Sequence, residues 1–289
     1  MPVNITTLKN VLSLKNDFDL FVFDVFGVLW DGSRLYENAA VHLAALKQAG
    51  KKVVILSNGT ERVKAMEKSQ SARGLEKGVH YDRIFSSGEL AYRCFSADRR
   101  RLKYYVYGIK EAALFAGSRY VEVTEPAVAD FVFIGIPKVC REGKTVNVLT
   151  VEPFKHELQK FAEQGLTLVC ANPDLRAYVG GYDEPVVCQG SLARYYEEIG
   201  GETEYFGKPY PEIFVAALEE YENIAPERIL MVGDTLETDI LGAASLGLKT
   251  ALITSGISYK NMTDEGEFDD LRAYMKDLRI EADYLLEAV

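Results

Sequence analysis

Short apolar runs alternate along the chain with longer segments of helical period. The run LFVF at residues 20–23 has the length of a buried strand, and residues 38–49 place their apolar side chains on one helical face before Gly50. A second strand is predicted over residues 52–56 and is followed by good helix formers at residues 61–73. Strands that alternate with helices in this order predict an α/β fold with a mainly parallel sheet.

The same alternation returns near the other end of the chain. A helix is predicted over residues 211–222, a strand over 229–232, a helix over 238–246 that ends at Gly247, and a strand over 250–253. We expect these elements to share one sheet with those at the start of the chain.

Further α/β material lies between these two parts. Strands are predicted over residues 104–107, 130–134 and 167–170, and a helix over residues 153–164. A chain of 289 residues is long enough for a core domain and a smaller second one. We therefore predict a Rossmann-like parallel-sheet core formed by residues 1–84 and 189–289, with an α/β domain inserted at residues 85–188.

Composition and charge narrow the class of protein. Hydrophobic residues make up 48% of the chain and charged residues 26%, which is the balance of a soluble globular protein. The net charge of −10 would repel a phosphate backbone, and the run Arg99, Arg100, Arg101 is too short to offset it, so we expect no nucleic-acid partner. The apolar runs are strand-sized, so neither a signal peptide nor a membrane span is predicted.

The four cysteines carry no sign of a metal site or a disulfide framework. They lie far apart, without CxxC spacing and without paired histidines. Reduced thiols of this kind are typical of a cytoplasmic protein, and we predict that location. The cysteines are Cys94, Cys140, Cys170 and Cys188.

Aspartates follow two of the predicted strands directly. Asp24 comes after the run at residues 20–23, Asp234 comes after the run at 229–232, and Asp239 lies five residues further on. An aspartate after one strand is often only a loop cap, but its repetition at the carboxyl ends of strands in one sheet predicts that the side chains converge. Because three adjacent carboxylates repel one another, a hard cation is implied, most plausibly Mg²⁺.

Two further segments are suited to holding an anion. Lys208 stands between Gly207 and Pro209, so stiff backbone places it. Ser57 closes the predicted strand and is followed by Asn58 and Gly59, whose N–H groups lie near a helix start. A surface lysine and a serine in a turn are the simpler readings of the same residues.

Taken together, four segments resemble the motifs of the haloacid dehalogenase superfamily. They are DVFGVLWDG, LSNGT, GKP and GDTLETD, in that order along the chain. The large insert between the second and third motifs, with ANPD at residues 171–174, is similar to class IIA, the NagD-like and nitrophenylphosphatase-like branch. The resemblance implies a Rossmann-like core with a large α/β cap domain, and a homodimer formed through the cap.

The resemblance also implies a role for each motif residue. Asp24 is expected to attack phosphorus and form an aspartyl-phosphate, with Ser57 and Lys208 holding the phosphoryl oxygens. Mg²⁺ is expected to bind Asp24, the backbone carbonyl of Phe26, Asp234 and Asp239.

The cap that the resemblance implies also suggests a substrate. We expect Asn172 and Asp174 to contact it, together with Asn58 and Gly59, although an Asn-Pro-Asp turn explains the first two residues equally well. A large cap favours a small phosphorylated metabolite over a protein substrate.

One position departs from the family's pattern. The family's phosphatases carry a second aspartate two residues after the nucleophile, as acid and base, and this chain has Phe26 there. Such a group contributes about 10²- to 10⁴-fold, so a slow phosphatase is predicted. Replacement by Asp31, in the same loop, is an alternative source of the proton.

Two other functions remain open. A catalytically silent protein that binds a phosphorylated metabolite would also tolerate Phe26. An aromatic residue at this position also resembles the metal-free dehalogenases of the superfamily, but Asp234 and Asp239 argue against that function, because a metal-free site gains nothing from their charge.

Overall fold

The computed structural model describes residues 5–179, 184–254, 256–259, 262 and 271–289. The chain divides into two compact units. The first unit is formed by Met1–Ser57, Lys64–Phe85 and Lys208–Val289, and the second by Asn58–Val63 and Ser86–Gly207. No helix in the described part of the chain is long and apolar enough to span a membrane.

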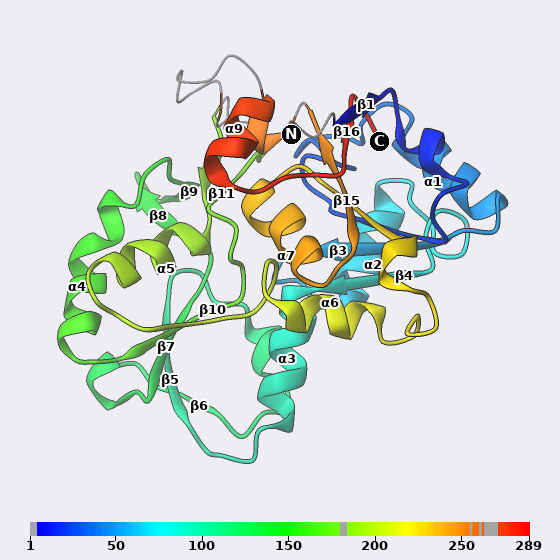
Figure 1. Ribbon diagram of the computed structural model, residues 1–289. Helices are drawn as coiled ribbons and strands as arrows, with labels where there is room; N and C mark the ends of the chain where they lie inside the picture. Colours follow the sequence, from blue (N-terminus) through cyan, green and yellow to red (C-terminus); the bar gives the residue numbers. More distant parts are fainter. Residues whose placement is uncertain (1–4, 180–183, 255, 260–261, 263–270) are drawn as a thin grey trace. The chain divides into compact units, whose positions relative to one another are not determined.

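A seven-stranded sheet forms the centre of the first unit (Figure 1). Its order is β1-β16-β15-β14-β2-β3-β4, and β14 pairs in parallel with both β15 and β2. The strands are β1 (Thr6–Leu8), β2 (Leu20–Phe23), β3 (Lys52–Ser57), β4 (Arg83–Ser86), β14 (Ile229–Gly233), β15 (Lys249–Ile253) and β16 (Tyr284–Leu286). The predicted strands at both ends of the chain therefore lie in one sheet.

Both faces of this sheet are covered, which is why its strands read as continuous apolar runs. Phe21, Phe23 and Ile55 pack on one face against α1 and α2, while Leu252 and Leu285 face α9 and η6 on the other. The helices of this unit are α1 (Ala39–Gln48), α2 (Val63–Ala72), α6 (Pro211–Leu218), η6 (Leu236–Ile240), α7 (Leu241–Ser245) and α9 (Leu271–Leu278). Short 3-10 segments are η1 (Val11–Leu14) and η5 (Pro226–Arg228).

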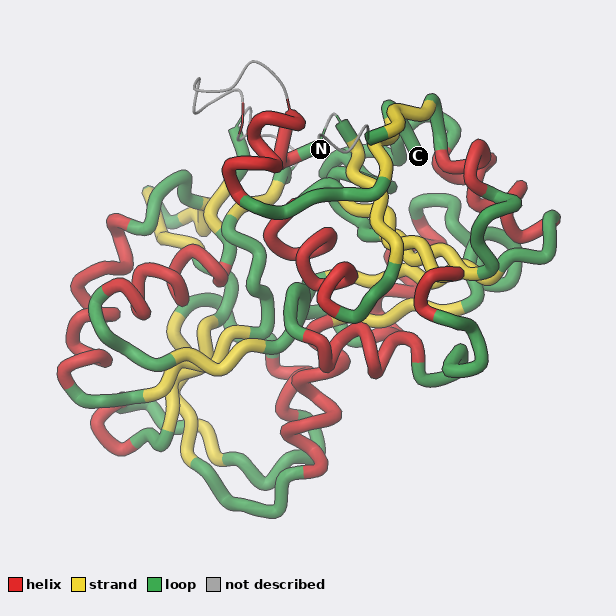
Figure 2. The backbone as a smooth tube through the Cα atoms, viewed as in Figure 1, coloured by secondary structure: helices red, strands yellow, loops and turns green. Residues whose placement is uncertain are grey.

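The second unit has its own parallel sheet, in the order β13-β10-β7-β5-β6. One face packs against α4 and α5, which lie side by side in Figures 1 and 2, and the other face packs against aromatic rings from α3 and η2. The main elements are α3 (Ser87–Ala97), β5 (Lys103–Tyr107), η2 (Ala112–Phe115), β6 (Val121–Glu122), β7 (Phe131–Ile134), α4 (Lys155–Glu163), β10 (Thr167–Cys170), α5 (Gln189–Glu198) and β13 (Thr203–Tyr205). Two hairpins complete it, β8 (Lys138–Arg141) with β9 (Lys144–Asn147) and β11 (Arg176–Ala177) with β12 (Val186–Val187); η3 (Pro126–Val128) and η4 (Glu152–Phe154) are single turns.

The architecture confirms the predicted α/β class, with a parallel-sheet core and an inserted α/β domain. The insert extends further along the chain than the predicted boundary at residue 188, because α5 and β13 belong to the second unit. The physical cause is strand pairing: Leu168 to Cys170 of β10 pair in parallel with Thr203 to Tyr205 of β13. The predicted helix over residues 238–246 is a π-helical turn, η6, that continues into α7.

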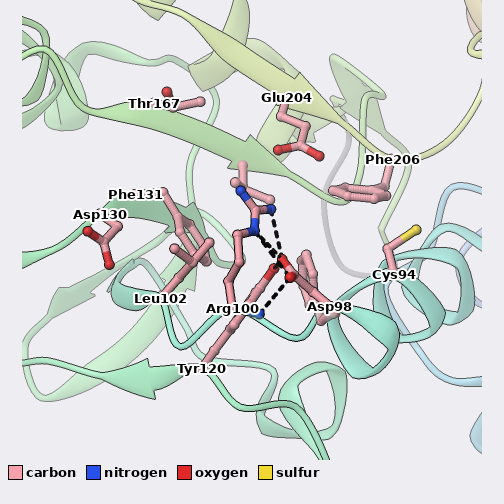
Figure 3. A pocket seen from close by; sticks show the side chains of 12 residues that line it. Cys94, Asp98, Arg100, Leu102, Tyr120, Asp130, Phe131, Thr167, Glu204 and Phe206 are labelled. Atoms are coloured by element: carbon pink, nitrogen blue, oxygen red, sulfur yellow. Dashed lines mark hydrogen bonds and ion pairs between the residues drawn. The ribbon is translucent and has the colours of Figure 1, made fainter.

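A hollow of about 360 Å³ lies on the second unit, between the end of α3 and the sheet (Figure 3). Its central charges satisfy one another. Nε and Nη2 of Arg100 donate to Oδ2 of Asp98 at 2.9 and 2.7 Å, Nε also donates to Oδ1 at 3.1 Å, and the Tyr120 hydroxyl donates to Oδ2 at 2.6 Å. These contacts fasten the end of α3 to the loop before β6.

Candidate active site

Three carboxylates meet at the carboxyl ends of the two central strands of the first unit. Asp24 follows β2, Asp234 follows β14, and Asp239 lies in η6. Each offers one oxygen atom, and the three oxygens lie within 4.8 Å of one another. The structure therefore brings together the three aspartates for which the sequence predicted convergence.

Glycines make this close approach possible. A Cβ atom on Gly27, which has a φ of +79°, would lie 1.9 Å from Oδ2 of Asp234. A Cβ atom on Gly233 would lie 2.2 Å from Cβ of Asp239, and one on Gly256 would lie 2.2 Å from Cβ of Asp234. Because real Cβ contacts are never this short, side chains at these positions would displace the carboxylates.

Backbone and side-chain donors fix the two buried carboxylates. Oδ2 of Asp234 accepts from the N–H of Ile257 at 2.8 Å, and its Oδ1 accepts from the Thr235 hydroxyl at 3.1 Å. Oδ2 of Asp239 accepts from the N–H groups of Asp234 and Thr235 at 3.1 and 3.2 Å. These donors fix the positions of both carboxylates.

Lys208 lies among these carboxylates, with a side chain that is only 1% exposed. Its Nζ donates to Oδ1 of Asp24 at 2.6 Å, to Oδ1 of Asp239 at 2.7 Å and to the carbonyl oxygen of Leu56 at 3.2 Å. An ammonium group has three protons, and each one has an acceptor here. Lys208 is therefore a buried residue bonded to the carboxylates of the site, and the alternative interpretation as a surface lysine is wrong.

The charges of the site fit a divalent cation. Three carboxylates and one ammonium group leave two negative charges in a largely buried place, and the donors are the hard oxygen ligands that Mg²⁺ and Ca²⁺ prefer. Asp24, Asp234 and Asp239 offer oxygen atoms close enough together to hold one ion. The loop that carries Phe26 follows Asp24 directly.

Phe26 is exposed in this loop, whereas its apolar neighbours are buried. The residue is 37% exposed, while Val25 and Val28 are each 1% exposed. The side chain has no proton to transfer, so the aromatic ring cannot replace the family's second aspartate.

Asp31 does not fit the role of a substitute acid. Its Oδ1 accepts from the N–H and hydroxyl of Ser33 and from the N–H of Arg34, at 2.7 to 2.8 Å. Burial works against the shift, but hydrogen bonds from Arg34 and Ser33 lower the pKa of Asp31 to about 2. A carboxyl group with this pKa is ionised at neutral pH and has no proton to donate.

The other predicted residues divide between the two units. Ser57 is buried at the end of β3 in the first unit. In the second unit, Nδ2 of Asn58 donates to Oδ1 of Asp174 at 2.7 Å, and Oδ1 of Asn172 accepts from the N–H of Asp174 at 3.0 Å. Asn58 and Asp174 therefore bind each other, and Asn172 closes the Asn-Pro-Asp turn that was the competing reading. Gly59 accepts at its carbonyl from the N–H of Gly88 at 3.2 Å.

Sequence reasoning missed the residues that orient the carboxylates. Ile257 acts through its backbone N–H, and Thr235 through both its N–H and its hydroxyl. A backbone donor leaves no signal in the residue type. The glycines were visible in the motifs, but their role depends on contacts across the sheet that the sequence alone does not show.

Comparisons with known proteins show which family the chain resembles. A family model described as haloacid dehalogenase-like hydrolase matches residues 21–117, and one described as HAD-hydrolase-like matches residues 205–279. Chronophin of Rattus norvegicus is 32% identical over 249 residues, covering 82% of this chain and 76% of the relative. Ribonucleotide monophosphatase NagD of Escherichia coli (strain K12) is 29% identical, covering 91% and 94%. A solved hydrolase of the haloacid dehalogenase-like family from Brucella suis 1330 has a TM-score of 0.79 at 27% identity, covering 98% and 99%.

Proposed function

The chain belongs to the haloacid dehalogenase-like hydrolases and is a phosphoric monoester hydrolase, and we propose that its substrates are small phosphate monoesters. In this proposal hydrolysis is slow, requires Mg²⁺ and takes place at the three-carboxylate site. One observation carries this proposal. Asp24 lies at the carboxyl end of a central strand, 2.6 Å from the buried ammonium group of Lys208 and beside two further carboxylates. The name of the NagD relative, a ribonucleotide monophosphatase, supports a small phosphorylated substrate.

In this proposal an oxygen of Asp24 attacks phosphorus and the bond to the leaving oxygen breaks. The resulting aspartyl-phosphate is then hydrolysed by water, which returns the Asp24 carboxylate and releases phosphate. Lys208 orients Asp24 through its hydrogen bond and offsets negative charge, and Ser57 is proposed to hold a phosphoryl oxygen. A divalent cation held by Asp24, the Phe26 carbonyl, Asp234 and Asp239 would stabilise the charge that develops on the phosphoryl group.

Phe26 sets the expected rate. Without an acid beside Asp24, the leaving oxygen must depart as an anion or take its proton from water. Esters with good leaving groups, such as nitrophenyl phosphate, are therefore expected to react faster than alkyl phosphates. The missing acid costs about 10²- to 10⁴-fold, which leaves room for measurable turnover because enzymes as a whole accelerate reactions by about 10⁶-fold or more.

The deciding experiment measures nitrophenyl phosphate hydrolysis by the purified chain with Mg²⁺, with a chelator, and with Asp24→Asn. Turnover that requires both the metal and Asp24 supports the proposal. Asp31→Asn is the matched control from the same loop, and it is expected to keep turnover because Asp31 is ionised and bound to Ser33 and Arg34. Turnover that persists in folded Asp24→Asn would contradict the mechanism.

Phe26 also favours a second candidate function, a catalytically silent protein that binds a phosphorylated metabolite. The same experiment separates the two, since folded, Mg²⁺-bound protein without any turnover would support the silent binder. The phosphatase proposal also includes substrate contacts by Asn58, Gly59, Asn172 and Asp174. It further includes a homodimer and a cytoplasmic location.

A further inference from the structure

Glu111 has an unusual environment in the second unit. It lies at the start of η2, and its Oε1 accepts a hydrogen bond from the hydroxyl of Thr60. Its Oε2 is buried and has no hydrogen-bond partner among the described residues. A buried oxygen that lacks a donor is costly when the group is ionised, and much less so when it is neutral.

Thr60 belongs to the short segment Asn58–Val63, which follows Ser57 directly in the chain and packs with the second unit. Other contacts fix the rest of this segment. The Ser86 hydroxyl donates to the carbonyl of Glu61 at 2.6 Å, and Oε2 of Glu89 accepts from Nε of Arg62 at 2.7 Å and from the N–H of Val63 at 3.2 Å. Asp174 and Gly88 hold Asn58 and Gly59, and Glu111 holds the Thr60 side chain in the middle of the segment.

The charged groups around Glu111 do not neutralise it. Glu61 raises its pKa by repulsion, and no ion pair of the described residues includes Glu111. On the nearby helix α3, Glu89 pairs with both Arg62 and Arg93, while Lys110 pairs with Glu122. Burial, with a smaller contribution from Glu61 and opposed by the hydrogen bond from Thr60, raises the pKa of Glu111 to about 7.

We propose that Glu111 is a positioning residue of the phosphatase: while it is neutral its carboxyl group stays buried and holds Thr60 in the segment after Ser57, and its ionisation draws the carboxyl group into water and so releases Thr60. The inference rests on the proposed function, because the segment is the chain's second motif. The Glu111 carboxyl group binds its proton more tightly when it is buried beside Thr60 than when it is exposed to water. The contact is therefore fully stable below about pH 4.5, the ordinary value for the group, and weakens as the pH rises through about 7.

The first test compares pH profiles of kcat/KM for nitrophenyl phosphate between wild type and Glu111→Gln. The amide is neutral at every pH, so the ratio of wild type to variant isolates Glu111 and cancels the titration of the substrate. We expect this ratio to fall by up to about tenfold between pH 6 and pH 8, as for one group with a pKa near 7. A flat ratio would overturn the proposal, whereas absence of turnover in wild type would instead contradict the proposed function.

A second readout needs no turnover. The Tm of wild type relative to Glu111→Gln is expected to fall by at least roughly 3 °C between pH 5 and pH 8, because the wild-type carboxyl must ionise in the folded state. A pH-independent Tm difference would overturn the proposal.

Thr60→Val and Thr60→Ser provide the matched pair if Glu111→Gln does not fold. Valine removes the hydroxyl at nearly equal volume, and serine keeps it. We expect Thr60→Val to lose the inflection near pH 7 in kcat/KM and Thr60→Ser to keep it. The same profile in both variants would show that the hydroxyl does not transmit the effect.

Discussion

At the scale of single residues, Lys208 controls the balance of charge in the site. It is the group that pairs with both Asp24 and Asp239, and it is fully buried. Removing one partner of a buried ion pair lowers the free energy of unfolding by about 3–5 kcal/mol. The carboxylates therefore depend on this ammonium group whenever no cation is bound.

Lys208→Met is therefore expected to reduce both turnover and stability. Loss of a donor aimed at developing charge costs about 10²- to 10³-fold in kcat. The loss of stability is expected to be larger in chelator than in Mg²⁺, since a bound cation offsets part of the unpaired charge. Steady-state kinetics and thermal melts in both buffers measure this, and equal destabilisation in the two buffers would contradict the charge argument.

Phe26 offers the opposite kind of test, a gain of activity. Phe26→Asp restores an acid two residues after Asp24, and we expect kcat on an alkyl phosphate to rise by about 10²-fold or more, with a smaller gain on nitrophenyl phosphate. Phe26→Asn is the matched control, because its side chain is polar and of similar size but carries no acidic proton. Equal gains in the two variants would mean that the ring limits access and not proton transfer.

At the scale of elements, the loops after β2 and β14 place the carboxylates by close backbone packing. Gly27 permits the approach of the β2 loop to Asp234, and a side chain there would meet Oδ2 at 1.9 Å. Gly50, at the end of α1, has nearly the same φ, +78° against +79°, but a Cβ atom there would have nothing within 4 Å. Substitution of Gly50 therefore tests backbone strain alone, whereas substitution of Gly27 tests the same strain together with displacement of the Asp234 carboxylate.

Gly50→Ala is expected to cost only the strain of a left-handed residue, about 1–2 kcal/mol, with unchanged kcat. Gly27→Ala is expected to carry the same strain and in addition to displace Asp234, so that both turnover and Mg²⁺ binding are lost. Kinetics and calorimetric titration of Mg²⁺ on the two folded variants check this. Normal Mg²⁺ affinity in Gly27→Ala would show that the loop adjusts without moving the carboxylate.

Elements also show what the sequence can and cannot predict. The strands before Asp24 and Asp234 were predictable because both faces of the sheet are buried, which leaves unbroken apolar runs. The extent of the inserted unit was not, because β13 joins it by pairing with β10, a contact between distant segments. The hydrogen bond of Asn58 to Asp174 spans 116 positions for the same reason, and no local pattern reports it.

At the scale of the whole molecule, the net charge of −10 includes the three carboxylates that converge at one edge of a sheet. Together with Lys208 they carry a formal charge of −2 in a largely buried site, which a bound divalent cation would offset. The site is therefore expected to couple metal binding to the stability of that unit.

Mg²⁺ is accordingly expected to stabilise the folded chain by mass action. At a free concentration 100 times its Kd the gain is about 2.7 kcal/mol, which corresponds to a rise in Tm of roughly 5–10 °C for a unit of this size. Calorimetric melts in Mg²⁺ and in chelator measure the shift, and Asp234→Asn should abolish it, because the variant removes one ligand charge while preserving the shape of the side chain. A shift of equal size in Asp234→Asn would mean that Mg²⁺ acts elsewhere on an acidic surface, and the carboxylate site would then need another explanation for its three converging oxygens.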